Sequence, residues 1–155
     1  LADLAGGTRG EVIAELCARL ANQRRQLSAE SLTRVVLERE SVMGTGLGEG
    51  LAIAHARLSD LRAPLLAFGR AGEGIDWDTP DGLPVHLAFV LLTPQRDDGL
   101  QLQILSALAQ SLSDEPARQR LRDASGEEEL WGALQDVLQP PVAKASSLAA
   151  SIDER

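Results

Sequence analysis

The feature that most constrains the fold is a glycine-rich segment, residues 44–50, in which every second residue is glycine. A short apolar run, Leu51–Ala54, follows it and ends at His55. Helix-forming sequence precedes the glycines, so the order is helix, loop and strand. A dinucleotide-binding fingerprint has its glycines between a strand and the following helix. The segment also lacks the Gly-Lys-Ser/Thr ending of a nucleotide-binding P-loop, so the sequence argues against both kinds of nucleotide site.

The residue types around His55 are those of a phosphohistidine site. Glycines allow backbone N–H groups to turn toward an anion without side chains in the way. A neutral imidazole is a good nucleophile near pH 7 and can accept a phosphoryl group. Arg39, a short way upstream, would balance the resulting charge. We therefore predict that His55 is a phosphoacceptor, whereas without these neighbours it would be read as a hydrogen-bonded histidine at a strand end.

The composition of the chain limits its domain number and the kinds of partner that it can bind. The chain has 155 residues, 44% of them apolar, which fits one domain with a substantial core. Its net charge is −8 and only 3% of its residues are aromatic. Nucleic acids and anionic membranes attract clustered Lys and Arg, and bases stack on aromatic rings, so neither partner is expected. No apolar run is long enough for membrane insertion, and the single cysteine, Cys17, fits a reducing compartment.

Capping residues and apolar spacing predict helices in the first and last parts of the chain. Two of these helices open on a capping box, formed by Thr8 with Glu11 and by Ser125 with Glu128. The predicted helices cover about residues 8–22, 28–42 and 100–112, with one more after Asp114 and one after Ser125.

Three apolar runs of strand length lie between the second and third predicted helices, at residues 51–54, 64–68 and 85–92. The last run is apolar at nearly every position, which indicates a strand buried on both faces. Helices before and after these strands predict an α/β fold, a single-domain sandwich with a mixed β-sheet flanked by helices. We assign residues 1–139 to this domain and the Ala/Ser-rich residues 140–155 to a tail or linker.

Three other groups of residues receive a structural interpretation. His86 lies within the buried strand and is expected to be structural. The aspartates of residues 76–81 suggest calcium only superficially, because their spacing misses the EF-hand pattern, so a turn is predicted. The arginines at 118, 120 and 122 are expected to form a solvated helix face.

Three blocks of motifs follow one another over roughly residues 8–138. The first comprises Arg39-Glu40, Thr45-Gly46-Leu47-Gly48-Glu49-Gly50 and Ile53-Ala54-His55. The second comprises Gly74-Ile75-Asp76-Trp77, Asp81-Gly82-Leu83-Pro84-Val85 and Phe89-Val90-Leu91-Leu92-Thr93-Pro94, and the third Leu105-Ser106-Ala107-Leu108-Ala109 and Glu128-Glu129-Leu130. In this order the blocks resemble the enzyme IIA domains of the bacterial phosphotransferase system, in the fructose/mannitol and nitrogen-regulatory class.

The resemblance implies a phosphocarrier or regulatory role and a set of site residues. His55 would accept a phosphoryl group from HPr or a similar carrier protein and pass it to a IIB domain, or its phosphorylation state would act as a signal. Arg39 and Thr45 would neighbour the phosphate, and a charged fork donor and a hydroxyl are groups that a phosphoryl oxygen requires. No cofactor and no metal ion is implied, and a cytoplasmic location is expected.

Two positions depart from the family pattern. The residue before the histidine is usually proline and here is Ala54. A second histidine is common at the start of the helix that follows the Thr-Pro block, and Gln101 stands there instead. A glutamine amide donates hydrogen bonds but carries no charge and shuttles no proton, which predicts inefficient onward transfer of the phosphoryl group.

Two alternatives to a sugar-system phosphocarrier remain open. IIA-like domains also occur as regulatory appendages of membrane transporters, including cation/proton antiporters, and would then be tethered to the inner membrane. The first residue, Leu1, the Ala/Ser tail, Ala54 and Gln101 favour that arrangement. The other alternative is a partner-binding domain that is not phosphorylated.

Overall fold

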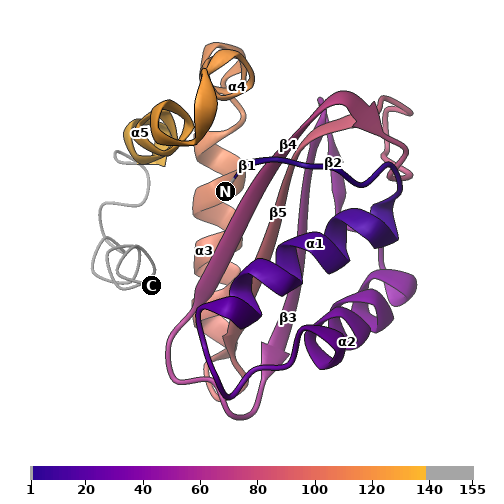
Figure 1. Ribbon diagram of the computed structural model, residues 1–155, viewed down its shortest axis with the longest axis vertical. Coiled ribbons are helices and arrows are strands. Elements are labelled where there is room, and N and C mark those ends of the chain that lie inside the picture. The colour runs from indigo at the N-terminus through magenta and orange to yellow at the C-terminus, as the bar shows by residue number, and fades with distance from the viewer. Residues whose placement is uncertain (1, 139–155) are drawn as a thin grey trace. The chain divides into compact units, whose positions relative to one another are not determined.

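A computed structural model, shown in Figure 1, describes residues 2–138 of the chain. The contacts within the chain group its residues into two compact units. The first unit consists of residues 3–56 and 65–92, and the second contains, among the described residues, Ala2 and residues 57–64 and 93–138. The predicted boundary at residue 139 and the predicted tail lie outside the described residues.

Two helices of the first unit, α1 (Arg9–Asn22) and α2 (Ala29–Val42), pack against each other. Figure 1 shows them side by side along the sheet, and α1 also contacts β4 (Leu65–Ile75). The predicted capping box of α1 is present, because Thr8 Oγ1 accepts from the Glu11 N–H at 3.2 Å and Glu11 accepts from the Thr8 N–H at 3.1 Å. Ser28 caps α2 as predicted.

The sheet has five strands in the order β1-β4-β5-β3-β2 within the described residues. The remaining strands are β1 (Ala2–Asp3), β2 (Gly46–Gly48), β3 (Leu51–Leu58) and β5 (Val85–Pro94). Strand β5 is antiparallel to β4, and β2 is antiparallel to β3. Strands β3 and β5 run parallel, because the Gly50 carbonyl accepts from the His86 N–H and the Leu58 carbonyl accepts from the Gln95 N–H. The predicted α/β fold with a mixed sheet is confirmed.

Strand β4 extends well beyond the predicted run of residues 64–68, because it continues to Ile75. Glycines at positions 69, 72 and 74 make this part read as a turn in the sequence. The ladder with β5 nevertheless continues to Arg70 and, after a register shift, resumes at Ile75 opposite Val85. On the other edge the Arg70 carbonyl accepts the Leu4 N–H at 2.7 Å. Pairing on both edges thus overrides the weak strand propensity of glycine.

The second unit contains α3 (Asp98–Ser111), α4 (Glu115–Asp123) and α5 (Gly126–Leu138), and α5 contacts both other helices. Asp114 caps α4 as predicted. At the start of α5, however, the Ser125 N–H donates to Glu129 and not to the predicted partner Glu128. Gly126 has a φ of 77°, so the regular helical turn begins one residue later than the sequence pattern indicates.

The prediction of a solvated arginine face on α4 is wrong for Arg118. This side chain is buried, and its Nη1 donates to the carbonyls of Leu112 and Ser113, each at 2.8 Å. The last carbonyls of a helix lack intrahelical partners, so a buried cation at the end of α3 satisfies them. Arg120 is exposed, and it pairs with Asp136.

No helix among residues 2–138 combines the length and the apolar character that crossing a bilayer requires.

The burial of Cys17 in the core of the first unit predicts that its thiol is protected from modification. Burial against α2 raises the pKa of this thiol to about 11, although a hydrogen bond with Thr33 opposes the shift. The folded state therefore disfavours the thiolate, and stability is lost as the pH rises from the unfolded thiol pKa toward 11. We expect iodoacetamide to leave native Cys17 unmodified and to alkylate it fully in guanidinium, as measured by mass spectrometry. Equal alkylation rates in both states would contradict this packing.

Candidate functional site

A buried carboxylate joins the end of α2 to the glycine-rich segment. The Glu40 side chain is 2% exposed, and it accepts the Thr45 N–H at 2.8 Å and the Thr45 hydroxyl. Arg9 Nη1 lies 3.8 Å from the same carboxylate and also donates to the Trp77 carbonyl at 3.5 Å. A buried charge is tolerated only when it is hydrogen-bonded and paired, and both conditions are met here.

The glycine-rich segment folds as the β2–β3 hairpin. Three successive residues, Gly48, Glu49 and Gly50, have positive φ values of 92°, 56° and 82°. This backbone region favours glycine, which explains the glycine on each side of Glu49. Asp81 holds the turn from outside, because its Oδ2 accepts the Glu49 N–H at 2.6 Å. That bond, with a second from the Leu83 N–H, lowers the pKa of Asp81.

The expectation that N–H groups of this segment face an external anion is wrong for two of them. The Thr45 N–H donates to Glu40 and the Glu49 N–H donates to Asp81, so both already serve carboxylates of the protein. The hairpin turn demands positive φ values, which accounts for Gly48 and Gly50. At Gly46 the reason is space, because a Cβ there would lie 2.7 Å from the Thr79 side chain.

Of the aspartates between residues 76 and 81, Asp81 lies in a turn, as predicted, whereas Asp76 forms an isolated β-bridge with Thr8. Asp81 Oδ1 accepts from the Thr79 hydroxyl at 3.0 Å and from the Leu83 N–H at 3.1 Å. Within the described residues no three His, Cys, Asp or Glu side chains gather in a way that could hold a metal ion.

His55 lies half-buried in β3, and a local hydrogen bond orients its ring. Its Nδ1 is 2.9 Å from the Ile53 carbonyl oxygen. A carbonyl oxygen only accepts, so the tautomer assigned from this contact carries the proton on Nδ1. In the neutral ring the nucleophilic lone pair is then on Nε2.

Backbone pairing brings Thr45 and His55 into one hydrogen-bonded chain. The Ile53 N–H donates to the Thr45 carbonyl at 3.2 Å, and the Ile53 carbonyl accepts from His55. Through Thr45 the chain continues to the Glu40 carboxylate. Two of the predicted site residues, Thr45 and His55, are thus linked within the first unit.

The other two predicted site residues have separate surroundings. Arg39 is half-buried in the last turn of α2, and its guanidinium forms no ion pair among residues 2–138. Gln101 belongs to the second unit, where it is largely buried and its Nε2 donates to the Thr93 hydroxyl at 3.2 Å. Their roles beside a phosphate stay predictions.

Glu40 is part of the first motif block in the sequence, but the sequence alone assigns it no role. One signal could have identified it. A carboxylate near a helix C-terminus is disfavoured by the helix dipole, so a glutamate at the end of α2 calls for a specific partner. The structure supplies that partner in Thr45.

His86 has the structural role expected for it. Its Nδ1 lies 2.9 Å from the Ala71 carbonyl oxygen, and its backbone N–H donates to the Gly50 carbonyl at 2.9 Å. These bonds connect β5 to β4 and to the end of the hairpin.

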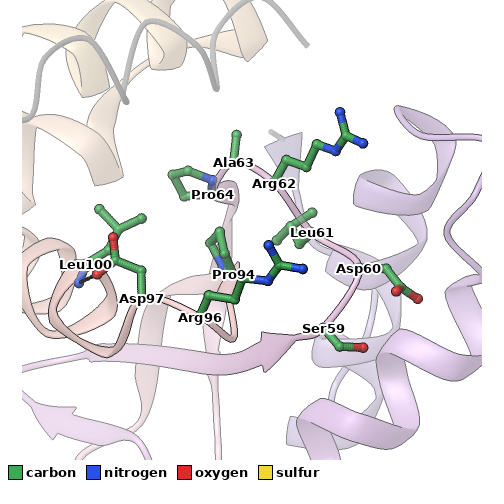
Figure 2. Close-up of a pocket in the computed structure, with 10 residues that line it drawn as sticks. All are labelled: Ser59, Asp60, Leu61, Arg62, Ala63, Pro64, Pro94, Arg96, Asp97 and Leu100. Carbon is green, nitrogen blue, oxygen red and sulfur yellow. Dashed lines mark hydrogen bonds between the residues drawn. The ribbon is translucent and has the colours of Figure 1, made fainter.

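A pocket of about 730 Å³ lies between two loops of the second unit, as Figure 2 shows. Its charged lining residues are Asp60, Arg62, Arg96 and Asp97, two of each sign. The pocket therefore offers no net positive charge to an anion, and none of the four predicted site residues lines it.

Comparison with known proteins adds the family relationship. The family model described as "Phosphoenolpyruvate-dependent sugar phosphotransferase system, EIIA 2" matches residues 1–137. The nitrogen regulatory protein of Pseudomonas aeruginosa is 33% identical over 137 residues, covering 88% of this chain and 89% of that protein. The PTS system fructose-specific EIIA component of Haloferax volcanii is 39% identical over 104 residues, covering 67% of this chain and 68% of that protein.

Solved structures share the fold. The crystal structure of nitrogen regulatory protein IIA-Ntr from Neisseria meningitidis superposes with a TM-score of 0.78 at 33% identity, covering 88% of this chain and 90% of that chain. The mannitol IIA enzyme of Escherichia coli, solved in complex with the phosphorylated IIB enzyme, has a TM-score of 0.70 at 18% identity, covering 88% of this chain and 92% of that chain. The latter likeness concerns the fold alone.

Proposed function

We propose that His55 is the phosphoryl acceptor of this chain, which belongs to the EIIA 2 family of the phosphoenolpyruvate-dependent sugar phosphotransferase system. The chain is thus a IIA-type domain of that system. The observation that favours His55 over His86 is its hydrogen-bonded link through Ile53 to Thr45. The 2.9 Å contact between its Nδ1 and the Ile53 carbonyl oxygen supports the choice of the reacting nitrogen. With the proton on Nδ1, the lone pair of Nε2 is the nucleophile of the neutral ring.

The proposed reaction is a direct transfer between two histidines. The Nε2 lone pair of His55 attacks the phosphorus of a phosphohistidine on an HPr-type carrier protein, a new N–P bond forms, and the carrier's N–P bond breaks. The carrier's ring nitrogen leaves with its electron pair, so no proton is needed at the phosphorus. The phosphorylated His55 ring keeps its Nδ1 proton and gains positive character. The Ile53 carbonyl then stabilises that charge through a charge-assisted hydrogen bond.

We propose that the Arg39 guanidinium binds the phosphoryl oxygens and balances their negative charge. A phosphohistidine carries two negative charges near neutral pH, and a guanidinium is the side chain best suited to bind phosphoryl oxygens. The absence of an ion pair for Arg39 among residues 2–138 supports this assignment, because no carboxylate there competes for it. Thr45 is assigned a supporting role, since its hydroxyl donates to Glu40.

A regulatory role is favoured over efficient sugar transport by Gln101. Its neutral amide donates to Thr93, and an amide cannot supply the charge or the mobile proton of a histidine. IIA domains partner with IIB domains, as the mannitol complex illustrates. We infer that this chain transfers slowly to such a partner and instead reports its phosphorylation state to a target such as an attached transporter. A cytoplasmic location, with or without such an attachment, is part of the same proposal.

We expect His55→Ala to abolish phosphorylation, because it removes the nucleophile. The domain is incubated with phosphoenolpyruvate, enzyme I and several HPr-type donors, and an acid-labile mass increase is measured. The chain has two histidines, so His86→Ala is the matched control and should still be labelled. Labelling that persists in His55→Ala would refute the assignment, and no labelling of the wild type by any donor would favour a partner-binding domain.

We expect Arg39→Ala to slow phosphorylation about tenfold to hundredfold, the effect of losing one charge-assisted hydrogen bond. The rate is measured by quenching the labelling reaction at successive times. Arg34→Ala, an exposed arginine of the same helix, is the control and should label at the wild-type rate. An unchanged rate in Arg39→Ala would show that its guanidinium serves another purpose.

We expect the phosphorylated wild type to pass its phosphoryl group slowly to IIB domains and Gln101→His to speed the transfer, because imidazole restores proton mobility. Gln103→His, at an exposed position of the same helix, controls for the added histidine. Transfer is measured by mass spectrometry of the IIB domain. Rapid transfer by the wild type would contradict the regulatory role and favour a role in sugar transport.

A further inference from the structure

We propose that Glu40 is a positioning residue for His55, because it diverts the Thr45 N–H and so leaves the Ile53 carbonyl to bind the imidazole ring. The inference rests on the proposed role of His55 as phosphoryl acceptor. It concerns how the protein selects the tautomer whose Nε2 is nucleophilic.

The register of the hairpin shows which hydrogen bond has been diverted. Gly46 pairs with Ala52 in the antiparallel β2–β3 ladder, so Thr45 is opposite Ile53 one step further along. Such a pair normally exchanges two bonds, each residue donating its N–H to the other's carbonyl. The first bond is present, from the Ile53 N–H to the Thr45 carbonyl at 3.2 Å.

The second bond of the pair is replaced by two others. The Thr45 N–H donates to Glu40 Oε2 at 2.8 Å, and the Ile53 carbonyl accepts from His55 Nδ1 at 2.9 Å. The N–H and the carbonyl of the missing bond are therefore each hydrogen-bonded to a side chain instead. Without Glu40 the Thr45 N–H and the imidazole would have to share the Ile53 carbonyl, so the diversion of the N–H and the orientation of the imidazole are coupled.

Burial and charge explain why the Thr45 N–H donates to Glu40 and not to the Ile53 carbonyl. A carboxylate is a stronger acceptor than a carbonyl, since hydrogen bonds to ionised groups are shorter and stronger. The Glu40 side chain is 2% exposed, so water offers it little competition for donors. The Thr45 N–H and hydroxyl are donors that a buried carboxylate requires, and Arg9 balances its charge.

Loss of the Glu40 carboxylate should allow the missing hydrogen bond between the Thr45 N–H and the Ile53 carbonyl to form. In Glu40→Gln a single neutral amide oxygen replaces the carboxylate, and it is a weaker acceptor for the Thr45 N–H. The Thr45 N–H then turns to the Ile53 carbonyl and competes with the imidazole for it. The His55 ring loses its fixed orientation and populates the tautomer with the proton on Nε2, which lacks a nucleophilic lone pair at that atom.

The test reads the His55 tautomer directly. Long-range ¹H–¹⁵N spectra of the whole chain, at a pH where the ring is neutral, should show the proton on Nδ1 in the wild type and a mixture of tautomers in Glu40→Gln. Phosphorylation of the variant should be about tenfold slower in kcat, the scale of one lost hydrogen bond, with KM for the donor little changed. The control is Glu38→Gln, an exposed glutamate of the same helix, which should match the wild type in all three readings.

A wild-type measurement keeps the proposal testable if Glu40→Gln does not fold. Couplings across hydrogen bonds should link the Thr45 amide nitrogen to the Glu40 carboxylate carbon. A coupling from that nitrogen to the Ile53 carbonyl carbon would overturn the proposal, as would a wild-type His55 protonated on Nε2 or a wild-type tautomer in a folded Glu40→Gln. These readings need no phosphate donor, so a failure of His55 to be phosphorylated would count against the proposed function alone.

Discussion

A carboxylate removed from water must be given donors and a counter-charge, and the first unit of this protein is organised around one. Glu40 is held at the end of α2, its charge is balanced by Arg9 from the first turn of α1, and its two oxygens accept from Thr45. Three separate pieces of chain therefore meet at one group. Removing one partner of such a group is costly, because the other charge stays buried without compensation. This requirement places Thr45 beside the strand that carries His55.

The hairpin adds a second constraint of a different kind. Three successive positive φ values turn the chain tightly between β2 and β3, and Asp81 holds that turn through the Glu49 N–H. Because the turn fixes the register, Thr45 lies opposite Ile53 and not one residue away. A slip of one residue would move Thr45 away from Ile53 and break its hydrogen-bonded link to His55. Backbone geometry at this turn is thus what Gly48 and Gly50 provide for the site.

Local patterns predicted much of this fold, and the failures have identifiable causes. The caps at Thr8, Ser28 and Asp114 depend on neighbours within one turn, so the sequence alone contains them. The far half of β4 was missed because its pairing with β5 and its contact with Leu4 outweigh its glycines. The burial of Arg118 depends on the carbonyls at the end of α3, which no helical periodicity reveals.

For the site, residue chemistry and a family resemblance selected His55, Arg39, Thr45 and Gln101, while the organising role of Glu40 needed the register of the hairpin. The central claim is that the protein presents Nε2 of His55 to the phosphoryl donor. Long-range ¹H–¹⁵N spectra of the phosphorylated chain test this most directly, because the nitrogen bonded to phosphorus has a distinct shift. The account predicts phosphorus on Nε2 of His55 with the proton retained on Nδ1. Phosphorus on Nδ1, or on any other residue, would contradict it.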